Sequence, residues 1–299
     1  MITPLDVETS KSDASPSPAS LCARTTAEPG GILKMREGEF VCLMYHDLGT
    51  PVERAGIEGT GHASYVVSGT AFASQMAHLR AQGLKGCKVG EALQGAGGVV
   101  ALTFDDGTST DIELAAPALS YAGFTATFYI VTARVETPGY LTRNELRCLS
   151  ELGFEIGSHS MTHPFLPRLG PEELRHELRD SKDQLEQWIG AAVSHFSCPF
   201  GGYTEATLAA AREAGYASFA TSRIGINKAG ATLLKRVAVL RSTSLHNFGR
   251  VCAGKSLIYP RARQVVLSGL RSAVGFPAYS LISHLRHRQK GTVKNGKVA

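Results

Sequence analysis

The chain has 299 residues, of which 43% are hydrophobic and 19% are charged. This length is enough for one complete (β/α) barrel, which takes roughly 200 to 250 residues, together with extensions, so we expect one main domain. No apolar run reaches the roughly 20 residues that a membrane-spanning helix needs, which argues against an integral membrane protein.

The net charge of +5 is divided unevenly along the chain. Residues 1–213 carry all 26 acidic residues and a net charge of −10, whereas residues 214–299 carry no acidic residue and a net charge of +15. A basic segment of this kind attracts phosphates, anionic lipid headgroups or acidic polymers. Nucleic acid is not favoured as a partner, because the basic residues are not interleaved with aromatic residues and no helix-turn-helix or zinc-finger spacing occurs.

The first thirty residues are rich in Ser, Thr, Pro and Ala and show no apolar periodicity. Such a composition is typical of disorder, and we expect a disordered extension over residues 1–38. The segment also lacks the basic start and the continuous apolar stretch of a secretory signal. The six cysteines show no close pairing, so we expect them to be reduced, and these features together predict a cytoplasmic protein.

Short apolar, β-rich runs recur through the middle of the chain and alternate with helix-like segments. That alternation predicts a parallel sheet, most simply a (β/α) barrel, over residues 39–250. The runs cover residues 41–45, 99–104, 126–131, 154–158, 195–200, 217–221 and 236–240. One intervening helix is expected over residues 171–189, with Pro171 in its first turn and Gly190 at its end.

Polar residues follow several of these runs at the point where each run ends. His46 follows the first run, Asp105 and Asp106 follow the second, and His159 follows the run at 154–158. The sequence Pro-Phe-Gly at 199–201 closes the next run. Since the reacting groups of (β/α) barrels lie at the C-terminal ends of the strands, we expect these side chains to meet at one rim.

Two histidines and one aspartate make a complete set of protein ligands for a catalytic divalent metal ion. His159 and His163 are four residues apart, and either Asp105 or Asp106 could supply the carboxylate. Neighbouring side chains on a strand point to opposite faces, so the second carboxylate is a candidate base that acts on a bound water. Each motif alone also has a structural interpretation, as a turn or as one face of a helix, but their common rim favours the metal site.

These motifs resemble those of the polysaccharide deacetylases that share the NodB homology domain, carbohydrate esterase family 4. The resemblance extends over residues 40–250 approximately and implies a distorted, TIM-like barrel. It also implies that Asp105 is the base and that Asp106, His159 and His163 bind the metal ion. Zinc is the first choice for this ion, and the same donors also suit Co²⁺, Ni²⁺ or Mn²⁺.

The third motif of the family has the form Arg-x-Pro-Tyr/Phe-Gly, and residues 197–201 read Ser-Cys-Pro-Phe-Gly. The resemblance implies that the backbone N–H of Phe200 donates to the oxyanion. Ser197 stands where many members have an arginine that orients the base. The way in which Asp105 is held is therefore open.

The later motifs of the family are missing or altered. No acidic residue occurs after Glu213, and Leu245-His246 departs from the Leu-x-His pattern of the general acid, which makes His246 a weak candidate. The sequence Leu-Met-Tyr-His-Asp at 43–47 resembles instead the start of the poly-β-1,6-N-acetylglucosamine deacetylases. This resemblance implies that His46 is the general acid; the alternative is a structural histidine that caps the first strand.

Residues 251–299 form a basic C-terminal extension that we expect to be partly helical, because two short amphipathic stretches occur in it. One interpretation is peripheral contact with a membrane surface, which would suit action on a precursor at the inner membrane face. The other is a terminal helix that packs on the barrel and is followed by a solvated tail.

The sequence as a whole predicts a metal-dependent hydrolase that removes N-acetyl groups from N-acetylhexosamine units of a polysaccharide or its precursor and releases acetate. An O-deacetylase or a small-molecule amidase of the same fold is an alternative, because the same ion and base serve esters and amides. A catalytically silent glycan-binding protein is a third interpretation, although such a protein needs neither both carboxylates nor both histidines.

Overall fold

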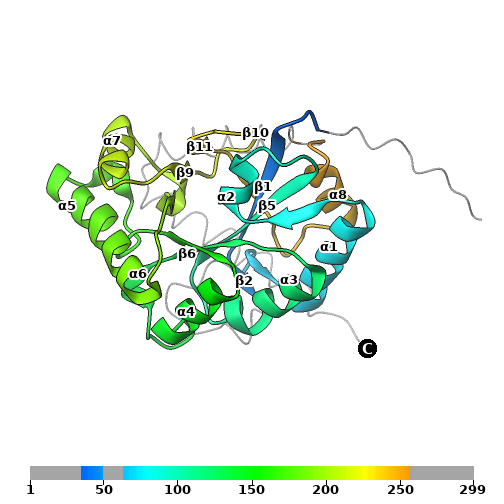
Figure 1. Cartoon of the computed structure of the whole chain (residues 1–299), viewed down its shortest axis with the longest axis horizontal. Helices are drawn as coiled ribbons and strands as arrows, with labels where there is room; N and C mark the ends of the chain where they lie inside the picture. The colour runs from blue at the N-terminus through cyan, green and yellow to red at the C-terminus, as the bar shows by residue number, and fades with distance from the viewer. Residues whose placement is uncertain (1–34, 50–62, 256, 258–299) are drawn as a thin grey trace, which may run out of the picture. The chain divides into compact units, whose positions relative to one another are not determined.

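A ring of parallel strands organises the fold of the computed structural model, which describes residues 35–49, 63–255 and 257 (Figure 1). In hydrogen-bonded order the ring consists of β1 (Glu39–Tyr45), β5 (Val99–Asp106), β6 (Thr127–Ile130), β7 (Glu155–Ser158), β8 (His195–Ser197), β9 (Ser218–Ala220) and β11 (Leu233–Leu234). The predicted (β/α) barrel is confirmed, and each apolar run of the sequence contains a strand of this sheet.

One short segment closes the ring. β11 pairs with β9, and β12 (Val237–Ala238) pairs with β1, both in parallel. Residues 235 and 236 connect these two strands and so span the gap between the ends of the sheet. Outside the ring, β4 (Lys85–Cys87) pairs with β5, β10 (Asn227–Lys228) runs antiparallel to β1, and β2 (Asp47–Leu48) pairs with β3 (Val66–Val67).

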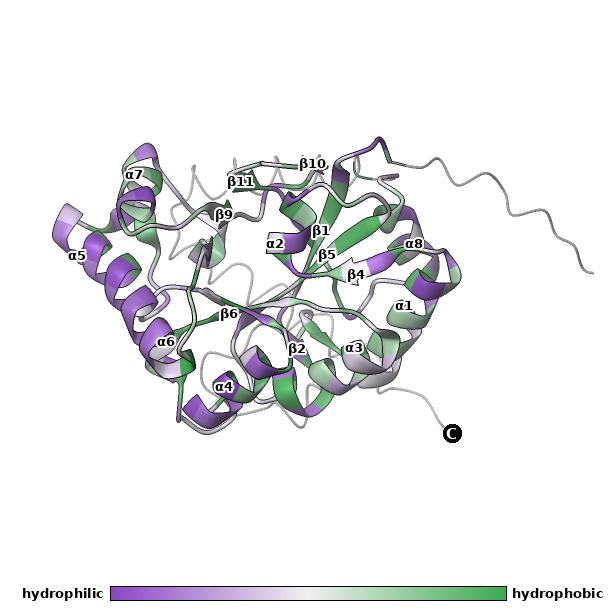
Figure 2. Cartoon of the chain, in the orientation of Figure 1, coloured by the Kyte–Doolittle hydropathy of each residue, from purple (hydrophilic) through white to green (hydrophobic). Residues whose placement is uncertain are grey.

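Helices follow most strands of the ring. They are α1 (Gly69–Ala81), α2 (Val89–Leu93), α3 (Ala116–Ala122), α4 (Arg143–Glu151), α5 (Pro171–Arg175), α6 (Ser181–Ile189), α7 (Glu205–Glu213) and α8 (Leu245–Cys252). The side chains of Ser68, Thr142 and Thr204 accept a backbone N–H at the starts of α1, α4 and α7. In Figure 2, β1 and β5 are largely hydrophobic, whereas α5 and α6 at the left edge are largely hydrophilic, the contrast expected when amphipathic helices cover a buried sheet.

Residue alternation along the strands separates an aromatic layer under the helices from the interior of the barrel. Tyr45, Phe104 and Phe128 lie in register on three neighbouring strands. The Tyr45 and Phe104 ring centroids are 5.1 Å apart, and those of Phe104 and Phe128 are 5.0 Å apart. Asp105 follows Phe104 along the strand and therefore faces the opposite side, into the barrel. The pattern of the strand thus fixes the direction of this carboxylate.

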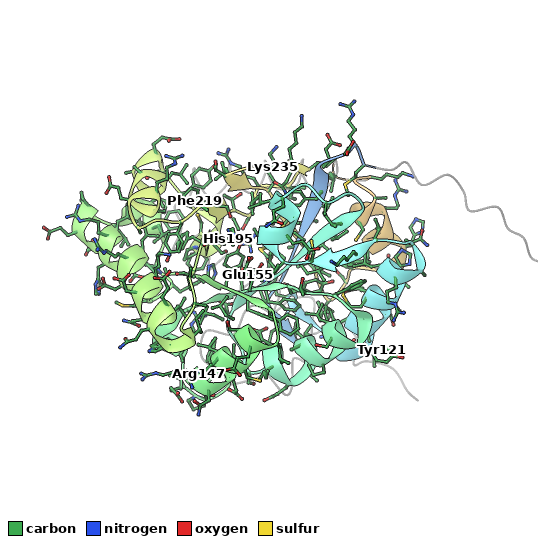
Figure 3. All side chains as sticks on the ribbon, viewed as in Figure 1. Tyr121, Arg147, Glu155, His195, Phe219 and Lys235 are labelled. Atoms are coloured by element: carbon green, nitrogen blue, oxygen red, sulfur yellow. The ribbon has the colours of Figure 1, made fainter. Side chains whose placement is uncertain are left out.

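A polar network fills the barrel at the N-terminal ends of the strands. Glu155 and His195 begin β7 and β8 and lie side by side, with Oε1 and Nε2 3.4 Å apart (Figure 3). Glu155 also accepts from the Thr127 hydroxyl at 2.6 Å and from the Gly90 N–H at 3.2 Å, and His195 Nδ1 lies 2.8 Å from Ser218 Oγ. Burial opposes ionisation of Glu155, but His195, Thr127 and Gly90 hold its pKa below the usual value. This network is satisfied internally and closes the base of the barrel.

The helix predicted over residues 171–189 is present and contains a π-helical turn, His176–Asp180, between α5 and α6. Gly190 ends it in the left-handed conformation, with φ 68°. A π-helical turn inserts an extra residue into the helical hydrogen-bond ladder and is often found at functional sites. Further short helical turns cover 111–115, 132–134, 166–168 and 199–201.

The two predicted extensions lie almost entirely outside the described residues, as does any membrane contact through residues 258–299. The domain boundaries at residues 38 and 250 therefore stay predictions. Among the residues with a described structure, no helix combines the length and the apolarity that crossing a bilayer would require. The described cysteines are free, as expected from their spacing.

Candidate active site

Asp106, His159 and His163 come together at the C-terminal ends of β5 and β7. Within the described part of the chain they form the one group of acidic, histidine or cysteine side chains arranged to hold a metal ion, and their ligand atoms all lie within 4.8 Å of one another. The Nε2 atoms of the two histidines are 3.2 Å apart, and His163 Nε2 is 3.6 Å from Asp106 Oδ1. The chemistry of this donor set fits a divalent transition metal ion.

The surrounding backbone orients these donors. His159 Nδ1 lies 2.8 Å from the Ser197 carbonyl oxygen. A hydrogen on Nδ1 donates to this oxygen and leaves Nε2 available, which is the usual support of a metal-binding histidine. Asp106, Ser160 and His163 all adopt positive φ, at 84°, 68° and 64°. Residues other than glycine rarely adopt this backbone conformation without a functional or structural reason. Here it helps to turn Asp106 and the two histidines toward the proposed metal site.

Burial keeps both imidazoles neutral. It lowers the pKa of His159 to about 4, against the opposing effect of Asp105. Burial and the nearby Arg134 guanidinium lower the pKa of His163 to about 3. Both rings are therefore unprotonated at neutral pH, the state in which imidazole can bind a metal ion.

Asp105 is held by Arg236, which the sequence analysis did not identify. Arg236 Nη1 donates to Asp105 Oδ1 at 2.7 Å, and Nη2 donates to Oδ2 at 2.8 Å. Burial raises the pKa of this carboxyl, but Arg236 and then His159 outweigh it and hold the pKa well below the usual range. Asp105 is therefore an ionised, buried carboxylate, and its Oδ2 lies 3.8 Å from His159 Nε2.

Arg236 reaches Asp105 from the segment that closes the barrel. Its Nη2 also donates to Ser197 Oγ at 2.8 Å, its Nη1 to Thr103 Oγ1 at 3.2 Å, and its Nε to the Thr221 carbonyl at 3.1 Å. Ser197 occupies the place at which the family resemblance suggested an arginine. Next to this small side chain lies the Arg236 guanidinium, which comes from the connection between β11 and β12. The signal in the sequence was an arginine at the start of a β-rich run, where a charge is costly unless it is paired.

A second arginine, Arg134, was also missed. It ends the helical turn Thr132–Arg134 after β6, and its Nη1 donates to Asp106 Oδ1 at 2.8 Å. Its guanidinium lies over the Tyr140 ring, 5.4 Å from the centroid. Arg134 balances the charge of Asp106 as Arg236 balances that of Asp105. No motif in the sequence pointed to Arg134.

His46 lies beside this cluster, directly after β1. Burial and other charged groups have larger effects on the pKa values of Asp105 and His163, but His46 also contributes to both. It therefore lies near both side chains. Its ring contacts that of Tyr65, with centroids 4.5 Å apart. Its Nδ1 is buried and has no hydrogen-bond partner among the described residues.

Phe200 completes the rim, and its φ of 57° is again positive. The residue is 45% exposed, and its ring packs in an edge-to-face arrangement with that of His163, with ring centroids 4.6 Å apart. The following Gly201 has φ 68°, and a Cβ there would lie 2.7 Å from the Ser222 backbone nitrogen. The Pro-Phe-Gly turn thus packs tightly against the loop after β9.

His246, the weak candidate for the general acid, is exposed in the first turn of α8.

The structure therefore brings together all six predicted site residues: Asp105, Asp106, His159, His163, His46 and Phe200. Residues 93–219 match the family model described as polysaccharide deacetylase. The chain contains a polysaccharide deacetylase domain. Both the predicted family resemblance and the barrel are confirmed.

Curated relatives match parts of the chain. YxkH of Bacillus subtilis is 31% identical over 152 residues, which are 50% of this chain and 54% of that protein. A peptidoglycan-N-acetylglucosamine deacetylase of Bacillus cereus is 32% identical over 119 residues, 40% of this chain and 54% of the enzyme. The chain thus spans about half the length of these relatives.

Solved structures share the fold over most of the described residues. The Streptococcus pyogenes deacetylase PplD, in complex with acetate, has a TM-score of 0.65 and 25% identity, with 72% of this chain and 99% of that chain covered. BC0361, a polysaccharide deacetylase from Bacillus cereus, has a TM-score of 0.62 and 25% identity, with coverages of 71% and 68%. IcaB from Ammonifex degensii has a TM-score of 0.63 at 22% identity and covers 73% of this chain and 97% of that chain.

Proposed function

We propose that the protein is a metal-dependent N-deacetylase that hydrolyses acetamido groups on N-acetylhexosamine units of a polysaccharide or its precursor. The observation that carries this proposal is the Asp-His-His ligand group next to a second, arginine-held carboxylate at the C-terminal rim of the barrel. The similarity to a peptidoglycan-N-acetylglucosamine deacetylase supports an acetylated amino sugar as the substrate. We also propose residues 39–250 as the catalytic domain.

Asp106, His159 and His163 would hold the ion, with zinc as our first choice. A bound divalent ion supplies Lewis acidity and lowers the pKa of water from 15.7 to about 7. Asp105 would then accept a proton from a water molecule whose pKa is already lowered. The low pKa of Asp105 keeps it ionised, and Arg236 fixes both of its oxygens.

Phe200 and His46 act on the two ends of the scissile amide. The Phe200 backbone N–H is the proposed donor to the oxyanion, and one such donor is typically worth roughly 3 kcal/mol. His46 is the proposed acid that protonates the departing nitrogen. The exposed Phe200 ring is the proposed apolar face on which a sugar stacks, whereas one face of the Tyr203 ring is covered by the Arg223 guanidinium, 5.0 Å from its centroid.

Metal analysis and acetate release test this proposal. We expect the purified protein to bind one divalent ion and to release acetate from N-acetylglucosamine oligomers. Asp105→Asn should keep the metal while turnover falls by about 10²- to 10⁴-fold, the usual contribution of a general base. Asp106→Asn, the matched neighbour, should lose the metal. Stoichiometric metal without acetate release from any acetylated glycan would favour the glycan-binding alternative, and near-normal turnover of Asp105→Asn would remove it from the mechanism.

A further inference from the structure

Glu177 contacts the loop that carries the two histidines from the helix that follows this loop in the sequence. Its Oε2 accepts the backbone N–H groups of Met161 at 2.8 Å and Thr162 at 2.9 Å. Its Oε1 accepts the Thr162 hydroxyl at 2.5 Å. The side chain is nearly buried, with a relative exposure of 6%. One carboxylate thus takes up three donors of a single short loop.

This loop needs an outside support because its backbone conformation is unusual. The loop spans residues 159–163, and both Ser160 and His163 have positive φ. The positive φ values interrupt any regular ladder, so the N–H groups of Met161 and Thr162 require acceptors from elsewhere. The loop is also tied to the 132–134 turn, through the Ala133 N–H that donates to the Met161 carbonyl at 2.9 Å.

The π-helical turn His176–Asp180 brings Glu177 to this loop. It begins one residue before Glu177 and ends just before Ser181. Ser181 Oγ lies 2.8 Å from Ser158 Oγ at the end of β7 and donates to the Glu177 carbonyl at 2.7 Å. Because the extra residue of a π turn changes which side chains share a helix face, both Glu177 and Ser181 can face β7 and its loop.

We infer that Glu177 is a positioning residue for the metal centre: its carboxylate fixes Met161 and Thr162 so that His163 is held next to His159. This inference rests on the proposed function, because it assumes that the two histidines bind a metal ion. Glu177 itself does not touch the ion or the substrate. It acts through the loop, in the way that outer contacts commonly preorganise metal ligands.

Metal affinity measured separately from activity tests the inference. In competition with a chelator, Glu177→Ala should bind Zn²⁺ on the order of 10- to 100-fold more weakly than the wild type. The visible spectrum of its Co²⁺ form should also change, because the geometry of the ligands changes. Glu177→Gln should recover most of the affinity, since its amide oxygen can accept the two N–H groups and its NH₂ can donate to the Thr162 hydroxyl.

Two further variants separate positioning from folding. Glu173→Ala is the matched control: Glu173 accepts the Gly170 N–H at 2.9 Å one turn earlier in the same helix, and no hydrogen bond joins it to the loop among the described residues, so the affinity of this variant should equal that of the wild type. Glu177→Asp keeps the charge but is one methylene shorter, and it should bind Zn²⁺ with intermediate affinity. This variant provides the test if Glu177→Ala does not fold.

The results distinguish the inference from the function on which it rests. Wild-type affinity and an unchanged Co²⁺ spectrum in Glu177→Ala or Glu177→Asp would overturn the positioning role and leave Glu177 as a structural contact. Absence of stoichiometric metal from the wild-type protein would overturn the proposed metal centre itself. A loss of affinity restricted to the Glu177 variants and relieved by Glu177→Gln would establish the role.

Discussion

At the scale of single residues, the site depends on charges that are buried in pairs. Asp105 and Arg236 are almost inaccessible to solvent and form a bidentate, hydrogen-bonded ion pair. Breaking such a pair by removing one partner typically costs about 3–5 kcal/mol, because the other charge stays buried alone. The pair therefore contributes to both the stability of the barrel and the ionisation of the proposed base.

Replacement of Arg236 by Met should change the pH dependence of the reaction. Without the guanidinium, burial dominates and the pKa of Asp105 rises, so the base becomes protonated at a higher pH. The acid limb of the kcat/KM profile should therefore move to higher pH, measured on acetate release at saturating metal. Urea unfolding should show a loss of about 3–5 kcal/mol, and a smaller loss when Arg236→Met is made in the Asp105→Asn background. An acid limb that stays in place would contradict the assignment.

Replacement of His46 by Ala should separate amide from ester substrates. An amine is a poor leaving group unless it is protonated, whereas an alcohol needs less help, so amide hydrolysis should fall by about 10²- to 10⁴-fold and ester hydrolysis much less. The measurement compares acetate release from an N-acetylglucosamine oligomer and from an O-acetylated xylan oligomer with the same protein. Equal losses on both substrates would favour a structural role for His46 at the end of β1.

At the scale of elements, the sequence predicts the strands and their rim well, because both follow from local patterns. Alternation along residues 99–106 places Phe104 under the helices and Asp105 in the barrel, and strand ends bring His159 to the same rim. The role of Arg236 could not be predicted from the sequence, because Arg236 and Asp105 are 131 positions apart. Its role depends on how the ring closes between β11 and β12, which no local pattern encodes.

The Pro-Phe-Gly turn gives a prediction at the same scale. Gly201 and Gly190 both have φ 68°, but a Cβ at Gly201 would lie 2.4 Å from Ser222 Oγ, whereas nothing lies within 4 Å of one at Gly190. Gly190→Ala should cost about 1–2 kcal/mol of stability from left-handed strain alone. Gly201→Ala should cost more and should also displace the Phe200 N–H, and we expect turnover to fall about 10²-fold, the effect of a misplacement of 1 Å.

Urea unfolding and acetate release on this pair of glycine variants provide the measurement. The pair controls for backbone strain, because only one of the two substitutions pushes on the neighbouring loop. Turnover that falls equally in both variants, once corrected for the folded fraction, would show that the turn after β8 does not position the oxyanion donor.

At the scale of the whole molecule, four thiols are buried in the fold, at Cys42, Cys87, Cys198 and Cys252. Burial raises the pKa of each to about 12, from an ordinary value of 9.0. Between these two values the unfolded chain loses the protons of these thiols and the folded chain keeps them. The free energy of unfolding should therefore fall as the pH rises above 9, by about 1.4 kcal/mol per pH unit for each thiol.

Urea unfolding under reducing conditions at a series of pH values from 8 to about 10.5 measures this slope. Cys42→Ala isolates one thiol: the lost volume lowers stability by the same amount at every pH, whereas the slope should become shallower by the contribution of one proton. Cys42 packs inside the barrel beside Ala101, so this change reports on the interior and not on the helices. A slope identical to that of the wild type would mean that the barrel interior admits solvent before it unfolds, and that Asp105 and Arg236 are less well shielded than their contacts indicate.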